Sequence, residues 1–168
     1  QSERQREANR MEKAGCSSVP EAVSQSINTM QINLKQQIST ITQEIEQHID
    51  RHPDLKKDRA LLRSIPGVGE VVSLRMTALY HSKDFTSASQ MAAYLGLVPR
   101  KRESGKYKGK AMLSKRGNPV IRAKLYMAAV VAKTWNPDIN AHYRRLKARN
   151  KTEMQTIGAA MRRLVQIC

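Results

Sequence analysis

Apolar residues recur every three or four positions over a long stretch in the first third of the chain. The steps between them are 3, 4, 4, 3, 4 and 4 residues. The members of this stripe are Ile27, Met30, Leu34, Ile38, Ile41, Ile45 and Ile49. Such spacing places them on one face of a helix, whose other faces are rich in Gln, Ser, Asn and Thr. We predict one long helix that starts near Glu21 and stops before Pro53.

The narrow stripe of this helix is open to two interpretations. The helix packs against its own domain, or it forms a coiled-coil arm that dimerises or spans between domains. A narrow seam with polar residues on every other face favours the arm. We therefore divide the chain into a helical, coiled-coil-like segment over residues 1–54 and a compact domain over residues 55–168.

Shorter apolar segments, separated by Gly and Pro, predict a set of shorter helices in the rest of the chain. Ser87 or Ser89 is the expected cap of a helix that Gly96 closes. Asn118 followed by Pro119 predicts the start of another. Further helices are expected after Pro137 and up to the end of the chain. No stretch alternates between apolar and polar residues as a strand does, so the predicted class is all-α.

The segment Ile65-Pro66-Gly67-Val68-Gly69 lies between two of these predicted helices. It has the form of a helix-hairpin-helix turn, in which Gly67 and Gly69 allow backbone N–H groups to approach a phosphate at a helix N-terminus. The alternative is an ordinary interhelical turn. Phosphate binding at these two glycines is our hypothesis.

The net charge of the chain indicates that this helical domain binds a polyanion. Thirty Lys and Arg oppose 14 Asp and Glu, which gives a net charge of +16. Nucleic acid is the expected partner, and double-stranded DNA in particular. A membrane surface is disfavoured because the chain has one Trp and one Phe and no long apolar run. The two cysteines, Cys16 and Cys168, have no neighbours at zinc-ligand spacing, so we expect no metal site and a cytoplasmic protein.

Most of this charge is concentrated in residues 99–124, where Glu103 is the only acid. The basic residues are Arg100, Lys101, Arg102, Lys106, Lys108, Lys110, Lys115, Arg116, Arg122 and Lys124. Glycines keep most of the segment from being helical. It also contains three hydroxyl groups, on Ser104, Tyr107 and Ser114. A hydroxyl among guanidinium groups is a candidate nucleophile for a phosphodiester, and chemistry alone does not choose among these three.

A series of short motifs in this half of the chain resembles a known family. The motifs are Ile65-Pro66-Gly67-Val68-Gly69, Tyr94-Leu95-Gly96-Leu97-Val98-Pro99-Arg100, Glu103-Ser104-Gly105, Gly109, Leu113-Ser114-Lys115-Arg116-Gly117-Asn118, Ile121-Arg122 and Leu125-Tyr126-Met127-Ala128-Ala129. In combination they resemble the C-terminal domain of transposases of the insertion-sequence family one-ten and of the related Piv-type site-specific DNA invertases.

The resemblance implies a serine nucleophile. In that family it lies in the Ser-Gly pair after the Pro-Arg motif, which is Ser104-Gly105 here. Family members join this domain through a coiled coil to an RuvC-like domain with an acidic site for divalent metal, expected to be Mg²⁺. Some are guided by a structured bridge RNA. Residues 1–52 carry no such acidic set, so we expect this chain to lack the metal and to be inactive without the missing half.

We therefore expect a DNA transposase or recombinase, bacterial or archaeal and nucleoid-associated, that oligomerises through its coiled-coil segment. The scissile phosphate would be held by basic residues, and our candidates are Arg100, Arg102, Lys106, Lys108, Lys115, Arg116 and Arg122. Two alternatives remain: a non-catalytic helix-hairpin-helix module with a dimerising arm, and an RNA-holding module. Since Gln1 begins the chain and Cys168 interrupts an apolar helical pattern, we expect a piece of a longer polypeptide.

Overall fold

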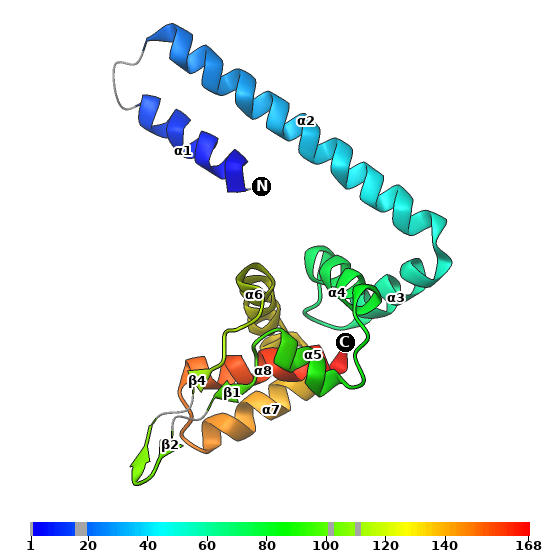
Figure 1. The fold of residues 1–168 in the computed structure, drawn as a ribbon, viewed down its shortest axis with the longest axis vertical. Helices are drawn as coiled ribbons and strands as arrows, with labels where there is room; N and C mark the ends of the chain where they lie inside the picture. Colours follow the sequence, from blue (N-terminus) through cyan, green and yellow to red (C-terminus); the bar gives the residue numbers. More distant parts are fainter. Residues whose placement is uncertain (1, 16–19, 101–102, 110–111) are drawn as a thin grey trace. The chain divides into compact units, whose positions relative to one another are not determined.

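The fold was analysed in a computed structural model that describes residues 2–15, 20–100, 103–109 and 112–168 (Figure 1). These residues form eight helices and four strands of two residues each, which confirms the predicted all-α class. The chain divides into two compact units, Gln1–Pro53 and Asp54–Cys168. Each unit is described by itself below.

The first unit is a pair of helices, α1 (Ser2–Gly15) and α2 (Glu21–Arg51), that pack against each other. The predicted long helix is confirmed, and it ends before Pro53 as expected. Its apolar stripe is only partly covered. Ile27 and Leu34 are half-buried, whereas Met30 and Ile41 keep 51% and 55% of their surface exposed. Dimerisation through this stripe stays a prediction.

The second unit opens with two helices, α3 (Pro53–Ser64) and α4 (Glu70–Ser82), joined by the glycine-containing turn. Gly67 adopts a φ of +100°, which L side chains rarely adopt. A Cβ on Gly67 would lie 2.6 Å from the Cβ of Ala132. The turn therefore packs directly on the helix that contains Ala132, and only glycine fits at this contact.

The next helix, α5 (Ala88–Tyr94), has clear start and stop signals. Of the two expected caps, Ser87 is the one used, since its side chain accepts a hydrogen bond from the Gln90 N–H at 3.2 Å. At the other end, Gly96 has a φ of +73°. The N–H groups of Gly96 and Leu97 donate to the Ala93 and Ala92 carbonyls, both at 2.9 Å. This is the Schellman arrangement, so Gly96 ends the helix as predicted.

Three longer helices complete the unit: α6 (Pro119–Trp135), α7 (Pro137–Ala148) and α8 (Glu153–Ile167). They pack against one another, and α5 and α4 cover α8 and α6 respectively. The core lies between them and consists of fully buried apolar side chains, among them Leu95, Leu125, Ala129, Ala132, Ile139 and Leu164. Burial of such side chains is the main force that holds the unit together.

The basic segment between α5 and α6 contains short strands that the sequence did not predict. β1 (Pro99–Arg100) pairs antiparallel with β4 (Met112–Leu113), and β2 (Glu103–Ser104) pairs with β3 (Tyr107–Lys108). Strands of two residues are too short to show an alternating pattern, because alternation needs at least four positions to be recognised. The basic segment, which we expected to be a loop, therefore contains two short antiparallel strand pairs.

Candidate active site

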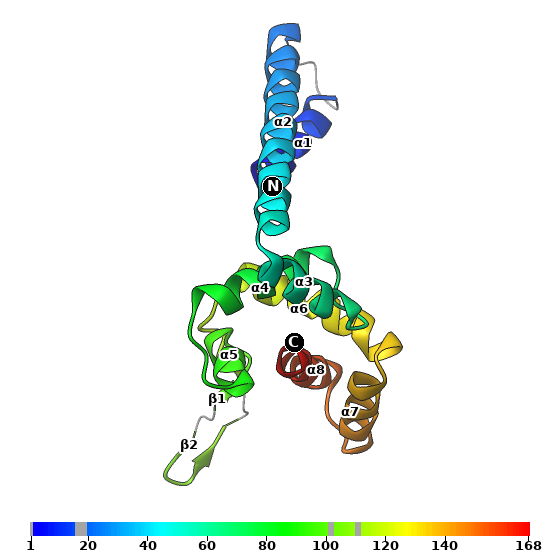
Figure 2. The ribbon, with the colours of Figure 1, turned by 90° about the vertical axis from the view of Figure 1, so that its right-hand side faces the viewer.

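Ser104 lies near the tip of a β-hairpin that extends away from the helices (Figures 1 and 2). In this hairpin, Ser104 pairs with Tyr107 across a loop of two residues, Gly105 and Lys106. Gly105 has a φ of +55°, as the first loop residue of a tight two-residue hairpin requires. Ser104, Gly105 and Lys106 are all exposed, so the hydroxyl is accessible to a large substrate.

The three hydroxyl candidates fall in two different places. Ser104 and Tyr107 are direct cross-strand partners in the tip hairpin. Ser114 follows β4 at the base of the segment, where it is half-buried and its N–H donates to the Val98 carbonyl at 2.9 Å. The structure thus separates Ser114 from the other two, and Ser104 is the exposed serine.

The base of the basic segment brings together charged residues from both of its ends. Arg100 on β1 pairs with Met112 on β4, and Lys115 follows two residues after that strand. The Lys115 N–H donates to the Gly96 carbonyl at 3.1 Å, with a φ of +56° at Lys115. Arg100, Lys115 and Arg116 are exposed. They present their charges around the ladder from which the hairpin extends.

The end of the basic segment is fixed to the start of α6. Asn118 caps α6 by accepting hydrogen bonds from the Val120 and Ile121 N–H groups at 2.8 and 3.4 Å, as the sequence predicts. The half-buried Arg122 donates from Nη1 to the Gly117 carbonyl. Since the Arg122 guanidinium already braces this turn, it acts on the hairpin through the backbone as well as through its charge.

The exposed basic side chains here face no acidic partner that the structure describes. Among the side chains that the structure describes, no ion pair joins Arg100, Lys106, Lys115 or Arg116 to an acid. Cations without protein partners are available to phosphate oxygens, and Arg can bind phosphate through two N–H groups at once. This arrangement suits a nucleic-acid backbone near Ser104.

Two of the predicted phosphate-binding residues lie where the structure describes little or nothing of their side chains. Arg102 lies outside the described residues. For Lys108, the structure gives the backbone pairing with Glu103. Their proposed role stays a prediction.

The predicted phosphate-binding glycines lie away from the hairpin. Gly67 contacts α6 near Ala132, ten residues or about 15 Å along the helix axis from Arg122. Gly69 is exposed at the N-terminus of α4, with open space where a Cβ would be. The next residue, Glu70, already forms ion pairs with Arg59 and, at 3.0 Å, with Arg63. A phosphate at this turn would therefore approach next to a carboxylate.

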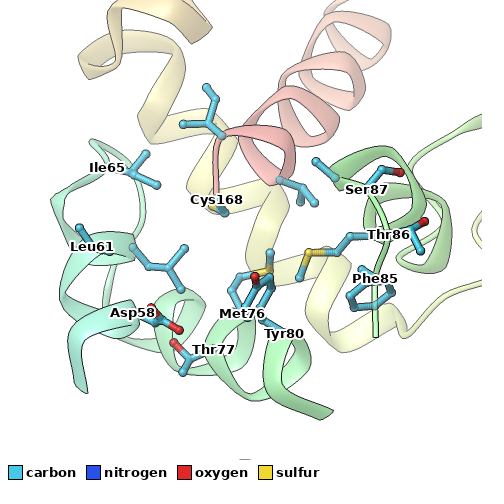
Figure 3. Close-up of a pocket in the computed structure, with 15 residues that line it drawn as sticks. Asp58, Leu61, Ile65, Met76, Thr77, Tyr80, Phe85, Thr86, Ser87 and Cys168 are labelled. Atoms are coloured by element: carbon cyan, nitrogen blue, oxygen red, sulfur yellow. The ribbon is translucent and has the colours of Figure 1, made fainter. Parts of the chain in front are cut away.

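A cavity of about 680 Å³ lies between α3, α4, α5 and the end of α8 (Figure 3). Apolar side chains such as Leu61, Ile65, Met76 and Phe85 line it. The described residues that line it include none from the basic segment. It is therefore separate from the hairpin that carries Ser104.

The described part of the chain contains no group of three or more His, Cys, Asp or Glu side chains that is suited to hold a metal ion. Nor does any described helix have the length and apolar character needed to cross a membrane.

This chain is similar to several known proteins. The family model described as the Transposase IS116/IS110/IS902 family matches residues 59–144. The pilin gene-inverting protein of Moraxella bovis is 31% identical over 141 residues, which cover 80% of this chain and 44% of the relative. The transposase for insertion sequence element IS1111A of Coxiella burnetii is 36% identical over 74 residues, or 44% of this chain and 20% of the relative.

This chain spans less than half the length of these relatives. The segment matched by the family model begins in α3, contains the whole Ser104 hairpin and its base, and continues into α7. It makes up about half of the chain, and the arrangement of Gly67, Gly96, Ser104 and Gly117 lies inside it. The chain therefore belongs to the IS116/IS110/IS902 transposase family.

Proposed function

We propose that this chain is the serine-bearing part of a DNA transposase or site-specific recombinase. The observation that supports it most is the position of Ser104, exposed near the tip of a hairpin whose base carries Arg100, Lys115 and Arg116 without acidic partners among the described side chains. Relatives that this chain matches are named as a transposase and as a gene-inverting protein.

The proposed reaction exchanges one phosphodiester for another. The Ser104 Oγ attacks a DNA phosphorus, the Oγ–P bond forms, and the bond between phosphorus and the 3′-oxygen breaks. The departing 3′-oxygen takes up a proton, while the serine proton passes to a base. In the second step a DNA 3′-hydroxyl gives up its proton and attacks the phosphoserine. The bond between phosphorus and the 3′-oxygen forms, the Oγ–P bond breaks, and the Ser104 Oγ takes up a proton. Bonds of the same kind are broken and made, so no oxidant, reductant or nucleotide cofactor is consumed.

The basic side chains supply electrostatic stabilisation in this scheme. A serine hydroxyl is a weak nucleophile at neutral pH and needs a base or strong cationic help. Exposed cations at the base of the hairpin stabilise the negative charge that develops on the phosphoryl oxygens. Arg122 positions the segment, because its guanidinium holds the Gly117 carbonyl. We assign the proton-accepting role to Glu103 or to an acidic group of the RuvC-like half.

We propose that the divalent metal of this reaction, expected to be Mg²⁺, is held by that RuvC-like half. We accordingly expect this chain to be inactive alone. A structured bridge RNA is the proposed guide in the full-length protein. The exposed stripe residues of α2, such as Met30 and Ile41, are the proposed contact between copies. Acting on DNA, the protein would be associated with the nucleoid.

A second candidate function is a non-catalytic helix-hairpin-helix module that binds DNA. The open backbone at Gly69, at the N-terminus of α4, favours it. Such a module would bind duplexes in a salt-dependent, sequence-tolerant way and would form no covalent product. Substitution of Ser104 would then have no effect.

Covalent trapping of DNA distinguishes the two candidates. The full-length protein, with Mg²⁺, its DNA and its guide RNA, is analysed on a denaturing gel for a protein–DNA adduct. We expect the adduct with the unmodified protein and with Ser114→Ala, and none with Ser104→Ala. If Ser104→Ala still forms the adduct and recombines DNA, the proposed nucleophile is wrong.

A further inference from the structure

A second group of basic residues lies on α7, on α8 and in the turn that joins them. Apart from Arg144, the last matched residue, it falls outside the segment matched by the family model. We call it the α7–α8 basic face. Its members are Arg144, Arg145, Arg149, Lys151, Arg162 and Arg163. All are exposed except Arg162, which is half-exposed.

Two arginines of this face come together from different helices. Arg145 on α7 contacts His142, with 2.8 Å between Arg145 Nη2 and His142 Nδ1. Burial and the nearby charges of Arg145 and Arg163 together lower the pKa of His142 below its ordinary value. Arg163 belongs to α8, which packs against α7. Both positive charges therefore act on the His142 ring and favour its neutral form.

The acid closest in sequence to this face already has other partners. Glu153 accepts a hydrogen bond from the Tyr143 hydroxyl at 2.5 Å and forms ion pairs with Lys133 at 3.0 Å and Lys147 at 3.5 Å. Among the described side chains, no ion pair joins a member of the α7–α8 basic face to an acid. The C-terminal dipole of α7 accounts for a cation such as Arg145, which lies in the last turn of that helix. It does not account for Arg163, which precedes the last turn of α8. Convergent cations favour an external polyanion.

The face continues toward the hairpin that carries Ser104. A Cβ on Gly158 of α8 would lie 3.3 Å from Leu113 of β4, so this side of α8 faces the base of the hairpin. Arg162 follows Gly158 by four residues and lies on the same side of the helix. Figure 2 shows α7 and the hairpin on either side of α8. Arg162 and Arg163 thus link the two basic regions.

We propose that the α7–α8 basic face binds the phosphates of duplex DNA that flanks the strand presented to Ser104. Exposed cations held on two packed helices can each pair with a backbone phosphate of a duplex. The two ring side chains of α7 already have partners, Tyr143 with Glu153 and Lys133 and His142 with Arg145. Neither is therefore a free platform for stacking single-stranded bases. This inference rests on the proposed function only in taking DNA as the substrate. It does not require Ser104 to be the nucleophile.

Salt-dependent binding tests the proposal with the chain of residues 1–168 and a labelled 30-base-pair DNA duplex. The variant removes three charges of the face, Arg145→Ala, Arg149→Ala and Arg163→Ala. A matched control removes three exposed charges elsewhere, Lys35→Ala, Lys57→Ala and Lys83→Ala. We expect the slope of log K against log salt to fall by about 2 to 3 in the variant, since each lost phosphate contact contributes about 0.9. In the control, the same slope should fall by less than about 1.

Two further sets of variants cover the case in which the triple alanine variant does not fold. Arg149→Gln and Arg163→Gln alone, each at an exposed position, should each lower the slope by about 1 if the triple variant does not fold. Replacing the three arginines by lysine should restore the binding. If the alanine variant binds the duplex as the control does, or loses binding to an RNA duplex of equal length and not to DNA, the proposal is overturned. An adduct retained by Ser104→Ala would reject the proposed nucleophile and leave this binding result standing.

Discussion

Gly96 and Gly117 lie so close together that a Cβ on Gly96 would be 2.9 Å from the Gly117 amide nitrogen. A Cβ on Gly117 would in turn collide with the Tyr94 carbonyl oxygen and lie 2.5 Å from the Leu95 carbonyl carbon. The end of α5 and the start of α6 therefore cross backbone against backbone. The basic segment between them begins and ends at this crossing, which fixes the base of the Ser104 hairpin.

We predict that Gly96→Ala and Gly117→Ala each destabilise the chain. Gly96→Ala adds the strain of a positive φ to a backbone collision, which together are expected to cost about 2 to 4 kcal/mol. Thermal or denaturant unfolding measures the loss. Gly69→Ala is the matched control, because its φ of −88° suits any residue and nothing lies within 4 Å of its Cβ position. Equal stability of all three variants would show that the crossing is not tightly packed.

Arg122 and Arg116 should differ in what their removal changes. Arg122 is half-buried and holds the Gly117 carbonyl, whereas Arg116 is exposed. We expect Arg122→Ala to lower the free energy of unfolding by about 1 to 3 kcal/mol, as the loss of a hydrogen bond from a charged group does. Arg116→Ala should leave the melting temperature unchanged and lower the salt slope of DNA binding by about 0.9. The reverse pattern would mean that the roles assigned to these two arginines are exchanged.

The acid at the start of α8 gives the fold a dependence on pH. Hydrogen bonds from Tyr143 and then from Lys133 hold the pKa of Glu153 at about 2, against an ordinary value of 4.5. Because the folded pKa is the lower one, this carboxylate stabilises the fold fully above about pH 4.5, and the contribution is lost as the pH falls through about 2.

The difference in melting temperature between the unmodified chain and Glu153→Gln should therefore be largest near neutral pH and should shrink toward pH 2. Asp84→Asn serves as the control, since the structure gives this exposed acid no ion pair among the described residues. A difference that stays constant across this range would show that the Glu153 charge contributes nothing to stability.

The helices of this chain were predictable from sequence because their signals are local. The pair Asn118-Pro119 predicts the start of α6, and Gly96 predicts the end of α5. The structure confirms both. The contacts of Gly67 with Ala132 and of Gly96 with Gly117 were not predictable. Each joins segments that are distant in sequence, and a glycine in a turn shows by itself only that the turn is tight.

The candidate site was less predictable from the sequence than the helices were. Residue chemistry left Ser104, Tyr107 and Ser114 open, and the family resemblance selected Ser104. The hairpin that makes Ser104 and Tyr107 cross-strand partners depends on strands of two residues, which have no recognisable period. The basic face on α7 and α8 had a signal in the run Arg144-Arg145-Leu146-Lys147-Ala148-Arg149. The convergence of Arg145 and Arg163 on His142 depends on how the two helices pack.

The most direct test of the central claim is to locate the DNA on the protein. The adduct of the full-length protein is digested with nuclease and trypsin, and the peptide that keeps a nucleotide is identified by mass spectrometry. Cleavage after Lys and Arg places the three hydroxyls on separate peptides, Glu103–Lys106 for Ser104, Tyr107–Lys108 for Tyr107 and Ala111–Lys115 for Ser114. We predict that the nucleotide mass lies on Glu103–Lys106. A nucleotide on either of the other two peptides would contradict the assignment of Ser104 as the nucleophile.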